Sequence, residues 1–281
     1  MSTVASRPKT EWHAHVWRCV SCGADATDPG DGGPIRCSAC RHQYPVREGI
    51  VIVRETVTAN NEVAQSFYNS PLWPKFRFWE WFTFVNLGGE RRARSRVLRH
   101  LPQGEHLKLL DIAIGDGVYL PWLPESWSVV GVDISEVQLD SCRDTTAKGR
   151  DVTLVLGEAE DLPVRDNQFD AALSIGAFNY FNDPEQALRE MVRAVKPGGT
   201  IVVSDEVPDL TDYLPFRKIG LAGIERWLVS RFMNLGEEFA EMVERHRKLD
   251  VEAIARRVLS DCHFERIWRG VGYVFVGRVP E

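Results

Sequence analysis

No run of apolar residues in this chain approaches the roughly 20 that a membrane-spanning helix requires. The nearest, residues 78–87, is short and is interrupted by Glu80. The start of the chain, residues 1–8, also lacks the apolar core of a secretory signal peptide. We therefore expect a protein without a membrane span, located in the cytoplasm.

An excess of positive charge is lacking as well. The 281 residues carry a net charge of −6 at pH 7, whereas broad nucleic-acid binding depends on basic residues that neutralise phosphates. Nucleic acid is therefore not the expected partner, although a local basic patch remains compatible with this composition. The length suits a catalytic domain joined to a smaller accessory one.

Cysteine is scarce but ordered, because four of the six cysteines form two Cys-x-x-Cys pairs. In a chain without an export signal this spacing favours zinc over disulfides or free thiols, which are the alternatives. Four thiolates complete a tetrahedron and leave no position for substrate, so the expected zinc is structural. The expected ligands are Cys19, Cys22, Cys37 and Cys40. The other two, Cys142 and Cys262, are expected in helical sequence as small buried residues.

This region resembles the zinc-ribbon domain of methyltransferase activator subunits, which is also found fused ahead of bacterial methyltransferase domains. The resemblance lies in residues 19–22 (CVSC), 37–40 (CSAC) and 44–50 (YPVREGI). A zinc ribbon alone could equally bind nucleic acid, so this resemblance does not decide the function.

The remainder of the chain divides by its pattern of apolar residues. We expect a zinc-ribbon domain over residues 1–57, a helical linker or lid over 58–106 and an α/β domain over 107–281, with a helical insertion at 208–248. Alternating strands and helices predict a largely parallel sheet with a Rossmann-like, doubly wound, seven-stranded architecture. The expected strands are 107–113, 127–133, 151–156, 169–175, 199–205, 263–269 and 271–278, and the expected helices are 117–123, 135–147, 183–195 and 250–260.

Two of the expected strands end in an acidic residue, which indicates a nucleoside-binding crevice. The first, in residues 109–117 (LLDIAIGDG), reaches Asp111 and continues into small residues at alternate positions, Ala113, Gly115 and Gly117. Such positions let a backbone turn sharply beneath a ligand. A dinucleotide-binding loop would instead read Gly-x-Gly-x-x-Gly. The second strand, residues 129–133 (VVGVD), ends at Asp133.

This spacing resembles the first motif of class I S-adenosylmethionine (SAM)-dependent methyltransferases, in particular the type 11 group of quinone-biosynthesis and small-molecule enzymes. Three later segments extend the resemblance: residues 156–163 (LGEAEDLP), 169–176 (FDAALSIG) and 196–204 (KPGGTIVVS). Each is common by itself, but together and in this order they form a specific pattern.

The resemblance implies SAM as cofactor and a role for each matching residue. Asp111 orients the loop that begins at Ala113, and the backbone from Gly115 to Gly117 lies under the methionine portion. Asp133, followed by Ile134, accepts hydrogen bonds from the ribose hydroxyls; the alternative for Asp133 is a helix N-cap beside Ser135. Glu158, where aspartate is more usual, accepts from the adenine amino group, and the Ala159 N–H meets a ring nitrogen. Ser174 lies where the fourth strand borders cofactor and substrate.

Methyl transfer from SAM depends mainly on alignment and exclusion of water, and alignment alone can supply up to about 7–11 kcal/mol. A general base is needed only if the acceptor must lose a proton. The candidates are Tyr180, whose alternative role is packing, and His246, whose alternative is an exposed position on a charged helix.

Two aromatic segments are expected to enclose a flat acceptor, unless their side chains form core instead. They are the helix around 73–84 and the insertion residues Tyr213, Phe216, Trp227 and Phe232. Arg91 and Arg94 would either reach the SAM carboxylate or an acidic acceptor, or form a solvated helix face.

The sequence thus favours a SAM-dependent methyltransferase with a structural zinc ribbon. Its expected partner is a small-molecule acceptor, an aromatic or polyketide-like metabolite methylated on oxygen or carbon, with nitrogen open. The alternative is an RNA methyltransferase whose ribbon binds RNA, and a third possibility is a SAM-binding scaffold without turnover. Four arginines of the ribbon support the RNA alternative: Arg18, Arg36, Arg41 and Arg47.

Overall fold

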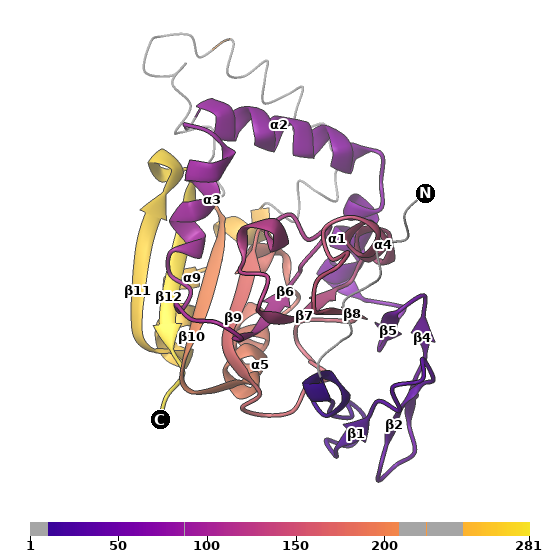
Figure 1. The fold of residues 1–281 in the computed structure, drawn as a ribbon. Coiled ribbons are helices and arrows are strands. Elements are labelled where there is room, and N and C mark those ends of the chain that lie inside the picture. Colours follow the sequence, from indigo (N-terminus) through magenta and orange to yellow (C-terminus); the bar gives the residue numbers. More distant parts are fainter. Residues whose placement is uncertain (1–10, 87, 208–222, 224–243) are drawn as a thin grey trace.

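The computed structural model describes residues 11–86, 88–207, 223 and 244–281. Its main sheet has nine strands in the order β11-β12-β10-β9-β6-β7-β8-β5-β4 (Figure 1). The segment 107–281 supplies β6 (Lys108–Ile112), β7 (Ser128–Asp133), β8 (Val152–Leu156), β9 (Phe169–Ile175), β10 (Val195–Glu206), β11 (Ser260–Ile267) and β12 (Gly272–Arg278). Within this segment the strands from β10 to β8 are parallel, and β12 runs antiparallel to its neighbours β10 and β11. This arrangement confirms the predicted α/β fold.

Three helices of this segment begin at polar caps. The caps Ser135, Asp183 and Asp250 each accept a hydrogen bond from a backbone N–H in the first turn of their helix. The helices are α4 (Glu136–Asp144), α5 (Pro184–Ala194) and α9 (Val251–Val258). The helix expected at 117–123 is only a short turn, η2 (Leu120–Trp122), because Pro121 has no N–H to continue a helical ladder.

The sheet extends beyond these strands into the N-terminal region. There, β4 (Val46–Arg47) pairs with β5 (Ile50–Ile52), and β5 runs parallel to β8. A separate three-stranded sheet is formed by β1 (Ala26–Thr27), β2 (Ile35–Cys37) and β3 (Gln43–Tyr44). The predicted boundary at residue 57 therefore follows two strands that belong to the sheet of the α/β segment.

The N-terminal region also shares a core with the rest of the protein. Trp17 forms a β-bridge with Val164, and the Arg18 N–H donates to the Pro163 carbonyl at 2.9 Å. Trp17 and Tyr44 are buried in the same apolar cluster as strands β6 to β10. At the short helix η1 (Glu11–Ala14), His13 is buried within 3.0 Å of an Asp151 carboxylate oxygen.

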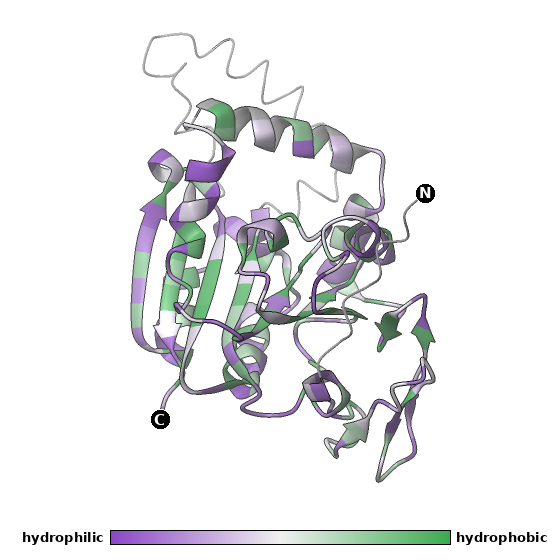
Figure 2. Ribbon diagram, viewed as in Figure 1, coloured by the Kyte–Doolittle hydropathy of each residue, from purple (hydrophilic) through white to green (hydrophobic). Residues whose placement is uncertain are grey.

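Three helices lie above the carboxyl ends of the parallel strands (Figure 1). They are α1 (Ala59–Tyr68), α2 (Leu72–Asn86) and α3 (Glu90–Leu98). Figure 2 shows that apolar residues concentrate on the central strands, whereas the edge strand β11 is largely hydrophilic. This distribution is expected, since the solvated face of an edge strand must remain compatible with water.

One further detail differs from the sequence expectations. Cys262 lies in β11 and not in a helix, although Cys142 is buried in α4 as expected. The four aromatic residues predicted in the insertion, at 213, 216, 227 and 232, lie outside the described residues. Among the described helices, none has the length and apolar character to cross a bilayer.

Candidate functional site: a cradle at the strand ends

Two neighbouring parallel strands end in buried carboxylates, Asp111 on β6 and Asp133 on β7. The Asp133 carboxylate accepts hydrogen bonds from the backbone N–H groups of Gly115 and Ser135, both at 2.8 Å. Asp133 thereby ties the loop after β6 to the end of β7. Ser135, not Asp133, caps the following helix, since its hydroxyl accepts from the Gln138 N–H at 3.2 Å. The alternative role of Asp133 as the N-cap is therefore wrong.

The loop after β6 turns through left-handed backbone at three alternate residues. Ala113, Gly115 and Gly117 have φ values of 59°, 56° and 70°. A Cβ on Gly117 would approach Thr146 Oγ1 to 2.4 Å, whereas a Cβ on Gly115 would meet nothing within 4 Å. Gly117 is thus required for packing, while the space beside Gly115 lets a ligand approach the backbone.

Burial opposes the ionisation of both carboxylates at this edge. Burial raises the pKa of Asp111 to about 8, with a further contribution from the nearby charge of Asp133. Burial likewise raises the pKa of Asp133 to about 6, although hydrogen bonds from backbone N–H groups oppose that rise. Such an edge favours a ligand that brings hydroxyl donors and positive charge.

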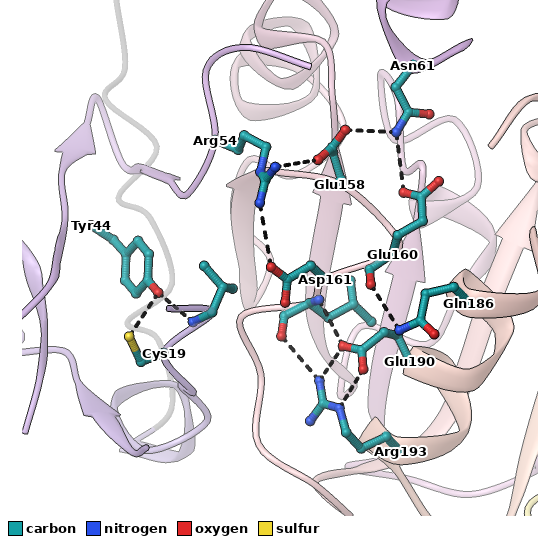
Figure 3. Close-up of polar contacts among 12 residues, drawn as sticks. Cys19, Tyr44, Arg54, Asn61, Glu158, Glu160, Asp161, Gln186, Glu190 and Arg193 are labelled. Carbon is teal, nitrogen blue, oxygen red and sulfur yellow. Dashed lines mark hydrogen bonds and ion pairs between the residues drawn. The ribbon is translucent and has the colours of Figure 1, made fainter. Parts of the chain in front are cut away.

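Side-chain contacts that the sequence did not predict surround the third strand end. Glu158, which follows β8, accepts from the Asn61 side-chain amide at 3.0 Å and pairs with Arg54 at 3.2 Å (Figure 3). The same Asn61 amide also donates to Glu160 at 3.3 Å. Ala159 is buried in the core. The adenine contacts of Glu158 and Ala159 remain predictions, and the structure adds Asn61 to them.

Helix α1 lies within the predicted helical linker or lid and contacts the residues that follow β7 and β9, although its individual polar contacts were not predicted. The Gln65 side-chain amide donates to the Ile134 carbonyl at 2.6 Å, and the Ser135 hydroxyl donates to Asn69 at 2.6 Å. The Tyr68 hydroxyl reaches the Gly176 carbonyl at 3.4 Å. One available signal was the spacing of polar residues 61, 65, 68 and 69, which lie on one helical face.

The fourth strand brings a different kind of polar group to the site. Ser174, in β9, is fully buried, and its hydroxyl has no hydrogen-bond partner within the described part of the chain. It lies in register with Ile112 of β6 and Val203 of β10. Its predicted role beside cofactor and substrate remains a prediction.

The two predicted base candidates lie together near this edge. Tyr180, in the turn η3 (Phe178–Tyr180), donates its hydroxyl proton to Glu206 Oε1 at 2.6 Å. The ring centroids of Tyr180 and His246 are 6.2 Å apart. His246 is buried, so its expected exposed position is wrong. Glu206 was missed, although the Asp-Glu pair at the end of an expected strand was visible in the sequence.

Helices α2 and α3 contact the loop after β6. Arg94 is buried, with its guanidinium 4.5 Å from the Tyr119 ring and 2.7 Å from Glu90. The solvated face expected for Arg91 and Arg94 therefore holds only for Arg91, which is exposed. The aromatic residues of α2 divide in the same way, because Phe84 is buried and Phe78 is exposed.

The four predicted zinc ligands form one cluster. The sulfur atoms of Cys19, Cys22, Cys37 and Cys40 all lie within 4.8 Å of one another, and none is in a disulfide. The closest pairs are 3.5 and 3.6 Å apart, near the separation of about 3.8 Å that a tetrahedron with Zn–S bonds of about 2.3 Å requires. Tyr44 supports the cluster, because its hydroxyl contacts the Cys19 sulfur at 3.6 Å (Figure 3). The cluster therefore fits a zinc ion.

A known protein family matches the part of the sequence that forms this edge of the sheet. Residues 110–203 match a family described as a methyltransferase domain. Demethylmenaquinone methyltransferase from Staphylococcus aureus is 37% identical over 39% of this chain and 47% of its own length. The enzyme of the same name from Renibacterium salmoninarum is 34% identical over 43% of this chain and 50% of its own. The chain thus spans about half the length of these curated relatives.

Solved structures show the same fold at lower identity. One is a possible exported protein from Bordetella parapertussis, with a TM-score of 0.52 and 22% identity, covering 79% of this chain and 80% of that one. Another is phosphoethanolamine N-methyltransferase 2 from Haemonchus contortus, solved with S-adenosyl-L-methionine, with a TM-score of 0.51 and 16% identity, covering 80% of this chain and 61% of that one. The segment of residues 110–203, which contains Asp111 and Asp133, is therefore similar to methyltransferase domains.

Proposed function

We propose that this protein binds SAM at the Asp111–Asp133 edge and transfers its methyl group to a small, flat acceptor. One observation carries this proposal most directly. The Asp133 carboxylate holds the Gly115 N–H while the space beside Gly115 remains open. A ligand can therefore lie against the loop backbone and reach the Asp133 carboxylate at the same time.

Different residues at this edge would bind different parts of SAM. A carboxylate has about four acceptor positions, so Asp133 can receive ribose hydroxyls in addition to its two backbone donors. Gly115 would lie beneath the methionine portion, and Asp111 would hold the start of the loop. Asn61 and Glu158 would meet the adenine ring.

SAM supplies a methyl group on a positively charged sulfur, and this charge disappears during transfer. The protein therefore has to align the acceptor and exclude water, which raises the rate through orientation. Helix α1 serves both tasks, because Gln65 and Tyr68 connect it to the residues that follow β7 and β9.

Zinc would be held by the four clustered cysteines and would act in the structure alone. Four thiolates fill a tetrahedral zinc completely, so no position remains for a water molecule or an acceptor. The cluster would instead fix the N-terminal region, whose strand β5 adjoins β8.

The acceptor we propose is a hydroxylated aromatic ring of the reduced naphthoquinone type. Two curated relatives are named as demethylmenaquinone methyltransferases, and their similarity includes about two fifths of this chain. The side of α1 and α2 near the site carries aromatic residues, with Trp73 stacked on Phe76 at 5.6 Å and Phe67 close to both. Aromatic walls favour a flat acceptor.

A labelling experiment tests this function. The protein is incubated with methyl-labelled SAM and, in separate reactions, with 1,4-naphthohydroquinone kept reduced under anaerobic conditions, a bacterial small-molecule extract, and total RNA. We expect label in the small-molecule reactions and none in RNA, with Asp133→Asn as the matched control that loses labelling. Label in RNA alone would overturn the proposed acceptor class. Absence of SAM binding in calorimetry would overturn the enzymatic function.

A further inference from the structure

A network of buried polar side chains lies at the ends of β9 and β10, beside the proposed cofactor edge. Tyr180 donates to Glu206 Oε1 at 2.6 Å. Asp205 accepts from the backbone N–H groups of Asn179 at 2.9 Å and of Glu206 at 2.8 Å. The Asn179 amide in turn donates to the Glu206 carbonyl at 3.0 Å. Hydrogen bonds thus connect four residues at the two strand ends.

The position of Tyr180 connects this network to the cofactor edge. Its ring packs in one apolar cluster with Ala64 and Phe67 of α1 and with Ile134, the residue that follows Asp133. The residue that follows the proposed ribose-binding carboxylate therefore belongs to the same apolar cluster as the phenol. An acceptor aligned with a methyl group at this edge would lie close to Tyr180.

The surroundings of Tyr180 favour the protonated form of its hydroxyl. Burial raises the pKa of Tyr180 well above its usual range, and the nearby charges of Glu206 and Asp205 raise it further. Burial also raises the pKa of Asp205. Among the described residues, the other titratable groups near the phenol are Tyr68 from α1 and His246 from the segment that precedes α9. Tyr180 can therefore release its proton only by passing it to a neighbouring acceptor.

We propose that Tyr180 and Glu206 form a proton relay that activates a hydroxyl group of the acceptor. This inference rests on the proposed methyltransferase function. The acceptor O–H proton moves to the Tyr180 oxygen while the Tyr180 proton moves to Glu206 Oε1. The freed electron pair forms the bond to the methyl carbon, and the pair of the broken C–S bond remains on sulfur. If a ring carbon attacks through conjugation, the displaced ring proton returns to the acceptor oxygen.

Asp205 and Asn179 act as positioning residues in this scheme. Asp205 fixes the backbone on both sides of the relay, because it binds the N–H of Asn179 and that of Glu206. The Tyr273 hydroxyl also donates to Asn179 Oδ1, at 2.7 Å, but it takes no part in the proton transfer. Tyr273 provides a matched control, since it is a buried tyrosine whose hydroxyl contacts an amide oxygen and, among the described residues, no carboxylate.

The test compares Tyr180→Phe with Tyr273→Phe. Phenylalanine preserves ring packing in both cases and removes one hydroxyl. We expect Tyr180→Phe to lower kcat for 1,4-naphthohydroquinone by about 10²–10⁴-fold, the usual contribution of a positioned proton acceptor. Its SAM dissociation constant should remain within about twofold of wild type, and Tyr273→Phe should lose less than about threefold in kcat.

The pH profile separates a relay from a structural role. Because the ionised acceptor needs no relay, the defect of Tyr180→Phe should shrink by up to about tenfold per pH unit as the pH rises toward the acceptor's own pKa, about 10 for a phenol. Glu206→Gln should show the same pH-dependent defect. Loss of SAM binding together with activity in Tyr180→Phe, or a defect that is constant with pH, would overturn the relay. Near-normal kcat in both Tyr180→Phe and Glu206→Gln would overturn the relay as well.

Discussion

Individual residues at this site combine burial with charge, and Asp111 shows the consequence most clearly. Its pKa of about 8 in the folded protein lies above the value of about 3.9 in an unfolded chain. Between these values the folded state binds more protons than the unfolded state. The stability contributed by Asp111 is therefore fully present below about pH 4 and is lost as the pH rises toward 8.

This linkage predicts the behaviour of Asp111→Asn. The variant should be stabilised relative to wild type, with a gain that grows by roughly 2–4 kcal/mol between pH 5 and pH 8. Urea unfolding at the two pH values measures this change. Asp140→Asn, in a half-exposed ion pair with Arg143 on α4, is the control and should change the free energy of unfolding by less than about 1 kcal/mol at either pH. An equal effect of Asp111→Asn at both pH values would contradict the assigned burial.

At this scale the sequence predicted some of the site residues. Asp111, Asp133 and the small residues between them follow directly from where apolar runs stop, because carboxyl ends of parallel strands meet at one edge. Asn61 could not be found in this way, and Glu206 was overlooked although it stands at the end of an expected strand. Each gains its importance from a partner far along the chain, Glu158 or Tyr180, and such contacts depend on tertiary packing.

Among the elements, α1 joins the separate strand ends into one site. Asn61 is its most buried polar residue and bridges the carboxylates of Glu158 and Glu160. Asn61→Ala should therefore lower the free energy of unfolding by about 1–3 kcal/mol, since two buried acceptors lose a donor. Ser66→Ala, on the exposed side of the same helix, should change it by less than about 0.5 kcal/mol. Equal effects of the two substitutions in urea unfolding would contradict the bridging role.

The elements also show where periodicity is informative. The strands β6, β7, β8, β9 and β12 were predicted to within one residue at each end, because apolar residues predominate in these buried runs. The strand β10 begins four residues earlier than expected, and β11 begins three residues earlier and ends two residues earlier. The strands β4 and β5 were missed, since they contain two and three residues and acquire strand character only by pairing, β5 with β8 and β4 with β5. Pro121 similarly reduced an expected helix to a single turn.

At the scale of the whole molecule, the zinc-ribbon region and the α/β segment depend on each other. Cys40→Ser should abolish stoichiometric zinc binding and lower the melting temperature of the whole chain, because the ribbon core includes Trp17 and Tyr44, which pack with the main sheet. Cys262→Ser is the control and should retain one zinc per chain, because Cys262 lies in β11, an edge strand of the main sheet, and does not belong to the cysteine cluster. Metal analysis and thermal unfolding provide the readouts. Full zinc content in Cys40→Ser would contradict the four-thiolate site.

The most direct test of the account is a calorimetric titration of SAM into the wild-type protein and Asp133→Asn. We predict one SAM bound per wild-type chain, and an affinity at least about tenfold weaker in Asp133→Asn, because asparagine has fewer acceptor positions for the ribose hydroxyls and for the Gly115 N–H. Absence of SAM binding by the wild type, or equal affinity in the folded variant, would contradict the placement of the cofactor at the Asp111–Asp133 edge.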